Sequence, residues 1–249
     1  SQYSWATPYI IQMADAGYIT GYDNGTFGPD NEVTNLEAIA LFARQMGALK
    51  DENKQILARA HEQYDETLKA YKLSWGSDEL AFMLYKGALK KSDLDTYIAS
   101  GRADSPMKRY EAAIIITKAM NGEQEATSQT GVSLDYTDKN EIPSNAIQYV
   151  NYVTQKEIMQ GMENGGFSPR TSVMRSQMAV MLARVVEKTD YKFETVHIES
   201  ISDDGTSLTV KNSKNETEVY AVSASTEFKV KGEAIQVKDM LTNVDAVIT

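Results

Sequence analysis

Residues 21–47 read "GYDNGTFGPDNEVTNLEAIALFARQMG" and place a run of turn-forming residues directly before a helix signal. The run Asp23-Asn24-Gly25 tolerates positive φ, and Pro29 keeps the following residues extended. Thr34 followed three residues later by Glu37 is a capping box, and the apolar spacing after it is helical. The stretch therefore predicts a turn that leads at once into a capped helix.

The same order of residues returns 140 positions later, in "GMENGGFSPRTSVMRSQMAVMLARVV" from Gly161 onward. Residues 4–33 align without gaps on residues 144–173, and the identities include the Gly, Asn, Phe and Pro of the turn. A weaker third copy lies between them, because Trp75 to Gly87 repeats the spacing of Trp5 to Gly17. Self-similarity of this kind is the signature of repeat architectures.

Each copy is expected to form a helix, a turn and a second helix that the turn brings back beside the first. The predicted boundaries are repeat 1 at 1–48, a linking helix at 49–71, repeat 2 at 72–121, a polar loop at 122–134 and repeat 3 at 135–190. In repeat 2 the Gly-rich turn is replaced by "KKSDLDTYIASGRADSP".

From Tyr191 the pattern changes to alternating apolar and polar residues rich in Val, Thr and Ile, which is typical of strands. Asp204-Gly205 is a hairpin signal. Residues 191–249 are thus predicted to be a small all-β domain, with last elements that are expected to lie beyond this chain.

Composition excludes several classes of function. A net charge of −10 argues against a nucleic-acid partner, which usually needs a basic surface. The chain has no cysteine, so disulfides and thiolate metal sites are excluded. No apolar run approaches the ~18 residues of a membrane helix, so no membrane insertion is expected, and any export signal is expected to have been removed before residue 1.

The three copies resemble S-layer homology modules, the cell-wall anchors of bacterial surface proteins, over about residues 1–187. The motifs that carry this resemblance are W-A-x(3)-I, G-Y-I-x-G-Y-x-N-G-T-F-x-P and V-T-x-x-E, and they are strongest in repeats 1 and 3. The resemblance implies a mainly α fold, a pseudo-threefold bundle of the three repeats with grooves between them. It also implies binding of secondary cell-wall polysaccharide that ends in a pyruvylated amino sugar.

The resemblance further implies which residues bind carbohydrate. The family's T-R-A-E-like motif falls on Thr34 to Glu37, Lys108 to Glu111 and Met174 to Gln177, so its ligand-binding Arg carries over to two positions and is replaced by Asn in repeat 1. The aromatic-x-Asp step that opens the family pattern is kept only in repeat 3. The candidate carbohydrate-binding residues are Arg109, Arg175, Trp5, Trp75, Asp138, Glu111, Asn35 and Gly161.

The residue types support a ligand role for the two arginines independently. With caps at 34, 108 and 174, Arg109 and Arg175 take the first helical position, where a cation opposes the helix dipole by about 0.3–1 kcal/mol. Helix stability therefore does not explain them, and their removal should leave the fold intact. A guanidinium fork beside helix-end amides is suited to a carboxylate. The alternative is that both arginines pair with neighbouring acids across the interface between repeats.

Other candidates are weaker. A Trp face at Trp5 or Trp75 could cover a sugar ring, although large aromatics at repeated positions are more often core residues, and Asn145 takes this place in repeat 3. The stretch "HEQYD" at 61–65 lacks the second His of a zinc protease. "DNGTFGPDNE" at 23–32 fails the ligand alternation of a calcium loop. No metal or cofactor is expected.

The sequence therefore predicts a non-catalytic anchor that holds a surface protein on the bacterial wall, outside the cell. Two alternatives stay open. The chain could belong to an S-layer subunit that acts mainly by self-assembly with other subunits, or to the anchor of an enzyme whose catalytic domain lies outside this chain.

Overall fold

The computed structural model describes residues 2–22, 24–188, 194–212, 214–223, 226, 228–230, 233–240 and 242–248. The predicted boundary near Asp190 and Tyr191 lies outside these residues. The described part is mainly helical up to Lys188 and forms strands from Glu194 onward, which confirms the predicted class, mainly α followed by a small β module.

The helices of the three repeats follow one another with two helices between them. Repeat 1 contains α1 (Thr7–Asp15) and α2 (Asn35–Gln45), and α3 (Lys54–Lys69) is the linking helix. Repeat 2 contains α4 (Ser77–Tyr85), α5 (Lys91–Tyr97) and α6 (Arg109–Ala119), and α7 (Glu123–Ser128) follows it. Repeat 3 contains α8 (Ile147–Gln155) and α9 (Arg175–Lys188).

Several local predictions are confirmed and two are corrected. Thr34 and Glu37 form the predicted capping box, in which the Thr34 N–H donates to Glu37 Oε2 at 2.8 Å. The stretch 122–134 is not simply a loop, because it contains α7. In repeat 2 an additional helix, α5, stands where repeats 1 and 3 have their turn. Both α5 and α7 are short and mostly polar, so neither has the apolar periodicity that identifies a helix from sequence.

Three short extended segments join the repeats at the centre. The N–H of Val33 donates to the carbonyl of Val173, that of Val173 to Met107, and that of Met107 to Val33, each at 2.9 Å. All three side chains are buried. The three hydrogen bonds close a ring in which each repeat holds the other two, and this ring gives the helical part its pseudo-threefold symmetry.

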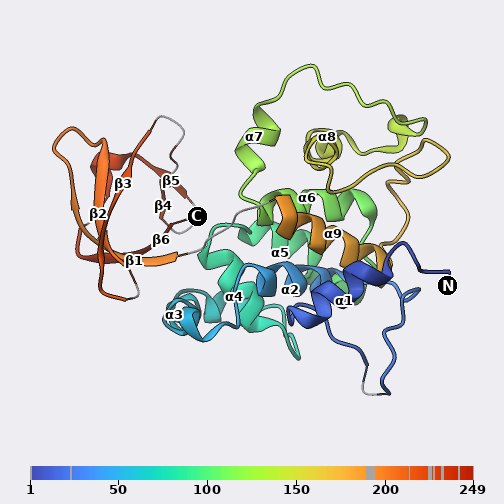
Figure 1. The fold of residues 1–249 in the computed structure, drawn as a ribbon, viewed down its shortest axis with the longest axis horizontal. Helices are drawn as coiled ribbons and strands as arrows, with labels where there is room; N and C mark the ends of the chain where they lie inside the picture. Colours follow the sequence, from blue (N-terminus) through green and yellow to red (C-terminus); the bar gives the residue numbers. More distant parts are fainter. Residues whose placement is uncertain are drawn as a thin grey trace.

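The turns do not bring the two helices of a repeat back beside each other, contrary to the sequence-based prediction. Instead, the first helix of each repeat packs on the second helix of the preceding repeat: α4 on α2, α8 on α6, and α1 on α9. Figure 1 shows α1 beside α9, although they come from opposite ends of the helical region. Every repeat is thus completed by its neighbours.

The helical repeats share one hydrophobic core, in which Phe42, Phe82 and Phe167 are fully buried. The prediction that the two tryptophans are most often core residues is wrong for this chain. Trp5 is 51% exposed and Trp75 is 40% exposed. Each Trp lies two residues before the start of its helix, and the small residue after it, Ala6 or Gly76, takes the buried position instead.

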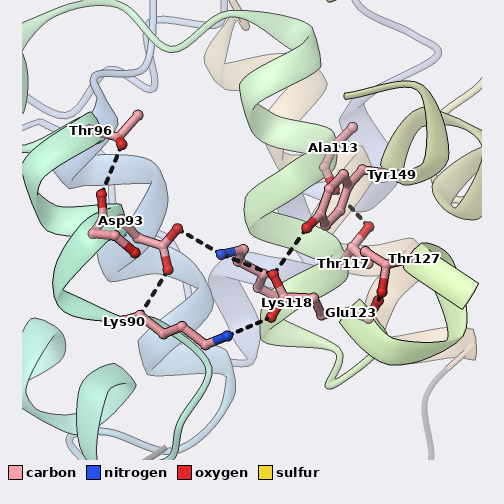
Figure 2. A network of polar contacts seen from close by, with 10 residues as sticks. Lys90, Asp93, Thr96, Ala113, Thr117, Lys118, Glu123, Thr127 and Tyr149 are labelled. Carbon is pink, nitrogen blue, oxygen red and sulfur yellow. Dashed lines mark hydrogen bonds and ion pairs between the residues drawn. The ribbon is translucent and has the colours of Figure 1, made fainter. Parts of the chain in front are cut away.

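A buried charge network joins repeats 2 and 3 (Figure 2). Lys118 Nζ on α6 contacts Asp93 Oδ1 on α5 at 2.6 Å and Glu123 Oε1 on α7 at 3.1 Å. Lys90 reaches Glu123 at 3.6 Å, and the Tyr149 hydroxyl on α8 donates to the same carboxylate at 3.0 Å. The network thereby links four helices through ion pairs and the Tyr149 hydrogen bond, and the Lys118–Asp93 pair is largely removed from water.

The β module has its own core of Val196, Ile198, Leu208 and Val210. Its strands are β1 (Glu194–Ile201), β2 (Ser207–Lys211), β3 (Thr217–Ala221), β4 (Phe228–Val230), β5 (Glu233–Ile235) and β6 (Val244–Ile248). An antiparallel sheet has the order β3-β2-β1-β6, and β4 pairs with β5. Gly205 has φ +69° in the β1–β2 connection, as the Asp-Gly signal predicted.

Among the described helices, none is both long enough and apolar enough to cross a membrane.

Candidate functional site

The start of each second helix lies against the turn region of the next repeat. The first helical residues are Asn35, Arg109 and Arg175, as predicted from the capping pattern. Their backbone N–H groups donate to the carbonyls of Ser105, Thr171 and Asn31 in the neighbouring repeat, at 2.9 to 3.0 Å. We name these contacts the 1/2, 2/3 and 3/1 interfaces after the repeats that they join.

At the 2/3 interface the Arg109 side chain is buried and only 3% exposed. Its Nε donates to the Phe167 carbonyl at 2.9 Å and its Nη2 to the Gln160 carbonyl at 3.1 Å. The guanidinium also lies over the Phe167 ring, 5.1 Å from its centroid. Burial lowers the pKa of Arg109 to about 10, against the opposing effect of Tyr136 and Asp138, so the group is a cation at neutral pH.

At the 3/1 interface Arg175 makes the same contacts but is only partly buried. Its Nε donates to the Phe27 carbonyl at 2.9 Å and its Nη2 to the Thr20 carbonyl at 2.7 Å. The guanidinium lies 4.7 Å from the centroids of both Tyr22 and Phe27. Within the described part of the chain, neither Arg175 nor Arg109 forms an ion pair with a carboxylate, so the expected alternative of acid pairing does not apply.

At the 1/2 interface Asn35 is fully buried and takes the place of the arginine. Its Nδ2 donates to the carbonyls of Tyr97 at 3.2 Å and Arg102 at 3.0 Å, again in the next repeat. Its Oδ1 has no hydrogen-bond partner among the described residues. The amide therefore supplies the bridge between repeats but no charge.

These contacts correct the expectation that the arginines have no part in the fold. Each first helical residue donates two side-chain hydrogen bonds to backbone carbonyls of the neighbouring repeat. The carbonyls belong to residues that are distant in sequence, and periodicity within one helix cannot reveal such partners.

Three further candidate residues, Asp138, Glu111 and Gly161, stabilise the turns and helix starts at these interfaces. Their contacts among the described residues do not bring them together in one cavity. Asp138 accepts from the N–H groups of Phe167 and Ser168, both at 2.7 Å, and so fixes the turn that Arg109 contacts. Glu111 accepts from the Lys108 N–H at 2.8 Å and pairs with Arg102 Nη2 at 2.7 Å. Gly161 is required by close packing, because a β-carbon there would lie 2.8 Å from the Tyr136 ring.

The two exposed tryptophans belong to different interfaces. Gly76, the residue after Trp75, packs against Leu36 at the start of α2, so Trp75 belongs to the 1/2 interface with Asn35. Because α1 packs on α9 as α4 packs on α2, we infer from the repeat relation that Trp5 lies beside the 3/1 interface. The 2/3 interface has Asn145 there. Only the 3/1 interface therefore combines a Trp with an Arg.

Sequence reasoning did not identify the aromatic residues under the arginines, Tyr22, Phe27 and Phe167. Phe27 and Phe167 were visible as repeated turn residues, and Tyr22 precedes the same turn. The signal that could have found them is the recurrence of an aromatic residue beside the Gly of two turns. Its link to an arginine in another repeat depends on the ring of repeats.

His61 lies between two carboxylates. Its Nδ1 lies 2.7 Å from Asp65 Oδ1 and its Nε2 lies 3.1 Å from Asp78 Oδ1. Burial of the ring opposes its charge, but Asp65 and Asp78 outweigh burial and raise the pKa of His61. In the described ranges, no group of three or more His, Asp or Glu side chains is placed to hold a metal ion.

Comparison with known families gives one family, which matches the chain at two segments. The sequence model of the S-layer homology domain matches residues 1–39 and 135–179. These are parts of the first and third repeats, and they include Trp5, Asp138 and Arg175. The middle repeat, which has an additional helix in place of the turn, lies outside the matched segments.

Three relatives show the kinds of protein in which such a chain occurs. The surface-layer 125 kDa protein of Lysinibacillus sphaericus is 25% identical over 91% of this chain, which is 19% of that protein. An endoglucanase of Bacillus sp. (strain KSM-635) is 24% identical over 81% of the chain and 20% of its own length. The cellulosome-anchoring protein of Acetivibrio thermocellus is 25% identical over 70% of the chain and 36% of its length. This chain thus spans only a fifth to about a third of these relatives.

Proposed function

Because the sequence model of the S-layer homology domain matches residues 1–39 and 135–179, we propose that the three repeats form a non-catalytic anchor that binds secondary cell-wall polysaccharide through a pyruvylated terminal amino sugar. The chain has a cell-surface anchoring role and is located outside the bacterial cell, at the wall. The identity of the glycan and the site that holds it are the proposed part.

The observation that supports a specific site is the unequal composition of the three interfaces. At the 3/1 interface Arg175 is partly exposed and has no carboxylate partner among the described residues, and the exposed Trp5 precedes the helix α1 that packs on α9. An anionic sugar needs both a cation for its carboxylate and an apolar face for its ring. We therefore assign the glycan to the 3/1 interface, with Arg175 and Trp5 as its main contacts.

The other two interfaces each lack one of these two features. At the 1/2 interface Trp75 is exposed, but Asn35 is neutral and fully buried. At the 2/3 interface the cation is present, but Arg109 is buried and Asn145 replaces the Trp. A direct ligand contact by Arg109 stays a prediction, and it would require the guanidinium to become accessible.

Calorimetry with a pyruvylated amino sugar tests the assignment. A charge-assisted hydrogen bond contributes about 1.5–3 kcal/mol, so Arg175→Gln should weaken binding about tenfold or more. Trp5→Ala should also weaken it, and Trp75→Ala should change it little. Arg170→Gln is the matched control, because Arg170 is exposed and precedes the same helix by a few residues. Normal binding by Arg175→Gln would exclude the 3/1 interface.

Sedimentation with cell walls tests the partner class itself. The chain should sediment with intact walls and stay in solution when the attached polysaccharide has been removed chemically. Equal binding to both preparations would favour direct recognition of peptidoglycan over the glycan. The endoglucanase relative supports a second possibility, in which the same anchor serves an enzyme whose catalytic domain lies outside this chain.

A further inference from the structure

The third residue of each repeat's second helix closes the hydrogen-bonded cap at the helix start. In α2 and α6 this residue is a glutamate, Glu37 or Glu111, and its carboxylate accepts from the N–H of the residue before the helix at 2.8 Å. In α9 it is Gln177, whose Oε1 accepts from the Met174 N–H at 3.2 Å. The first turn of α9 therefore has no acidic residue, whereas those of α2 and α6 each have one.

Helix stability does not explain the glutamine. The helix dipole favours a negative charge in the first turn, and a carboxylate is a stronger acceptor than an amide oxygen for the same N–H. At the start of α6, Arg109 and Glu111 lie in one turn, so their charges partly offset each other. At the start of α9, Arg175 already opposes the dipole and Gln177 carries no charge. The positive charge of Arg175 is thus uncompensated within its own helix turn.

Two carboxylates of repeat 1 lie on the segment that contacts this helix start. Asp30 accepts from the Tyr3 hydroxyl, and Glu32 belongs to the short antiparallel contact with the residue before α9. Both residues are exposed, and water and salt strongly screen exposed charges. Gln177 is partly buried and belongs to the same turn as Arg175. A charge at that position would therefore act on the site with less screening.

We propose that Gln177 is a specificity-determining residue of the 3/1 interface, and that its neutral amide makes this site prefer an anionic sugar over a neutral one. The inference rests on the proposed glycan site, because it assigns the origin of that site's charge preference. Arg175 attracts the carboxylate of the ligand, and a carboxylate at position 177 would repel it from within the same turn. Over several ångströms near a protein surface, one such charge changes affinity by about five- to tenfold.

Calorimetry at low salt with two probes tests the proposal: the pyruvylated amino sugar, and the same amino sugar without its pyruvyl group. In Gln177→Glu the ratio of affinities for the acidic over the neutral sugar should fall by about five- to tenfold. Glu37→Gln is the matched control, because it makes the reverse change at the start of α2, and it should leave this ratio as in the native chain. Raising the salt concentration should make the decrease in Gln177→Glu smaller, since salt screens the added charge.

Melting of the same variant separates an effect of charge from damage to the fold. Gln177→Glu keeps an acceptor for the Met174 N–H and adds a favourable charge at the helix start, so its melting temperature should equal or exceed that of the native chain. Weaker binding of the acidic sugar together with undiminished melting is the expected combination. A loss of affinity that persists at high salt, or that accompanies a lower melting temperature, would overturn the proposal.

Arg175→Gln distinguishes a failure of this proposal from a failure of the glycan site itself. If Arg175→Gln binds the acidic sugar more weakly while Gln177→Glu binds it as the native chain does, Gln177 does not determine specificity and the glycan site stands. If neither variant changes binding, the ligand is not held at the 3/1 interface, and the proposal for Gln177 is wrong together with the site.

Discussion

At the scale of single residues, Arg109 shows how one side chain can connect two repeats. Its two hydrogen bonds end on carbonyls more than 50 residues away in sequence, and its guanidinium covers a buried Phe167 ring. Arg109 fills space between two repeats, and it satisfies the buried carbonyl of Phe167 and the partly buried carbonyl of Gln160. Arg109 therefore contributes to the contact between repeats 2 and 3, whether or not it also binds a ligand.

We predict that Arg109→Ala lowers the free energy of unfolding by about 2–4 kcal/mol, because it leaves buried carbonyls unpaired and opens a cavity. Urea denaturation followed by circular dichroism measures this. Arg170→Ala, at an exposed site, should stay within about 0.5 kcal/mol of the native chain. A similar small effect for Arg109→Ala would show that the bridge between repeats 2 and 3 contributes little.

Asn35 shows where residue-by-residue transfer from a family reaches its limit. The sequence identified its position at the start of a helix and its departure from Arg. It could not show that the amide is fully buried and donates both of its hydrogen bonds to repeat 2. Burial at a helix start depends on which neighbouring repeat lies over it, and that information is non-local.

At the scale of elements, one polar interaction between α3 and α4 depends on the protonation of His61. A neutral imidazole can donate from only one ring nitrogen, whereas His61 faces a carboxylate at each nitrogen. Both hydrogen bonds require the protonated ring. The raised pKa of His61 therefore reflects a preference of the folded state for the imidazolium.

We predict that this contact stabilises the fold below about pH 6.5, the unfolded pKa of His, and that the gain is lost as pH rises through the higher folded pKa. The carboxylates are half exposed, so the effect should stay below about 1 kcal/mol. Denaturation of the native chain and His61→Gln between pH 5 and about 9 measures it. A constant difference between the two across this range would contradict the prediction.

The comparison with His61→Gln is needed because Lys86 titrates in the same range. Burial lowers the pKa of Lys86 to about 7, so the folded state disfavours its charged form. That contribution has the opposite sign, since it makes the protein more stable as pH rises from about 7 toward the ordinary value of 10.5. Both the native chain and His61→Gln contain Lys86, so its contribution cancels in the difference between their stabilities.

The Lys118 network is the second contact that belongs to this scale. Lys118 and Asp93 have side chains that are only 8% and 11% exposed, so removing one charge leaves the other uncompensated. We predict that Lys118→Met lowers stability by about 3–5 kcal/mol, and that Lys118→Met with Asp93→Asn recovers a large part of this loss. Urea denaturation of both variants measures it, and equal stability of the single and double variants would rule out a mutual charge pair.

The order of the elements could be predicted from the sequence, but their partners could not. Capping residues and apolar periodicity located α1, α2, α6, α8 and α9, and alternation located the first strands. The repeat pattern suggested self-contained helix pairs, whereas the hydrogen bonds of Val33, Met107 and Val173 show repeats that complete one another. Helix α7 was missed because its six residues, five polar and one Ala, carry no periodic apolar signal.

At the scale of the whole molecule, the ring of repeats makes the proposed glycan site depend on both ends of the helical region. Arg175 belongs to repeat 3, and Trp5, Tyr22 and Phe27 belong to repeat 1. A chain that lacks repeat 1 loses these aromatic residues, the α1–α9 contact and two of the three central hydrogen bonds. Each repeat in this protein is thus a unit of sequence but not a unit of folding.

The β module should be separable where single repeats are not, because it has a core of its own. We predict that a fragment of residues 1–190 unfolds cooperatively and binds walls as the whole chain does, whereas residues 49–249, without repeat 1, lose both properties. Denaturation monitored by circular dichroism and sedimentation with intact walls measure the two outcomes. If the 1–190 fragment folds but no longer sediments, part of the wall site lies in residues 191–249. If residues 49–249 still bind, the site cannot be at the 3/1 interface, since every contact that repeat 1 provides to Arg175 is then absent.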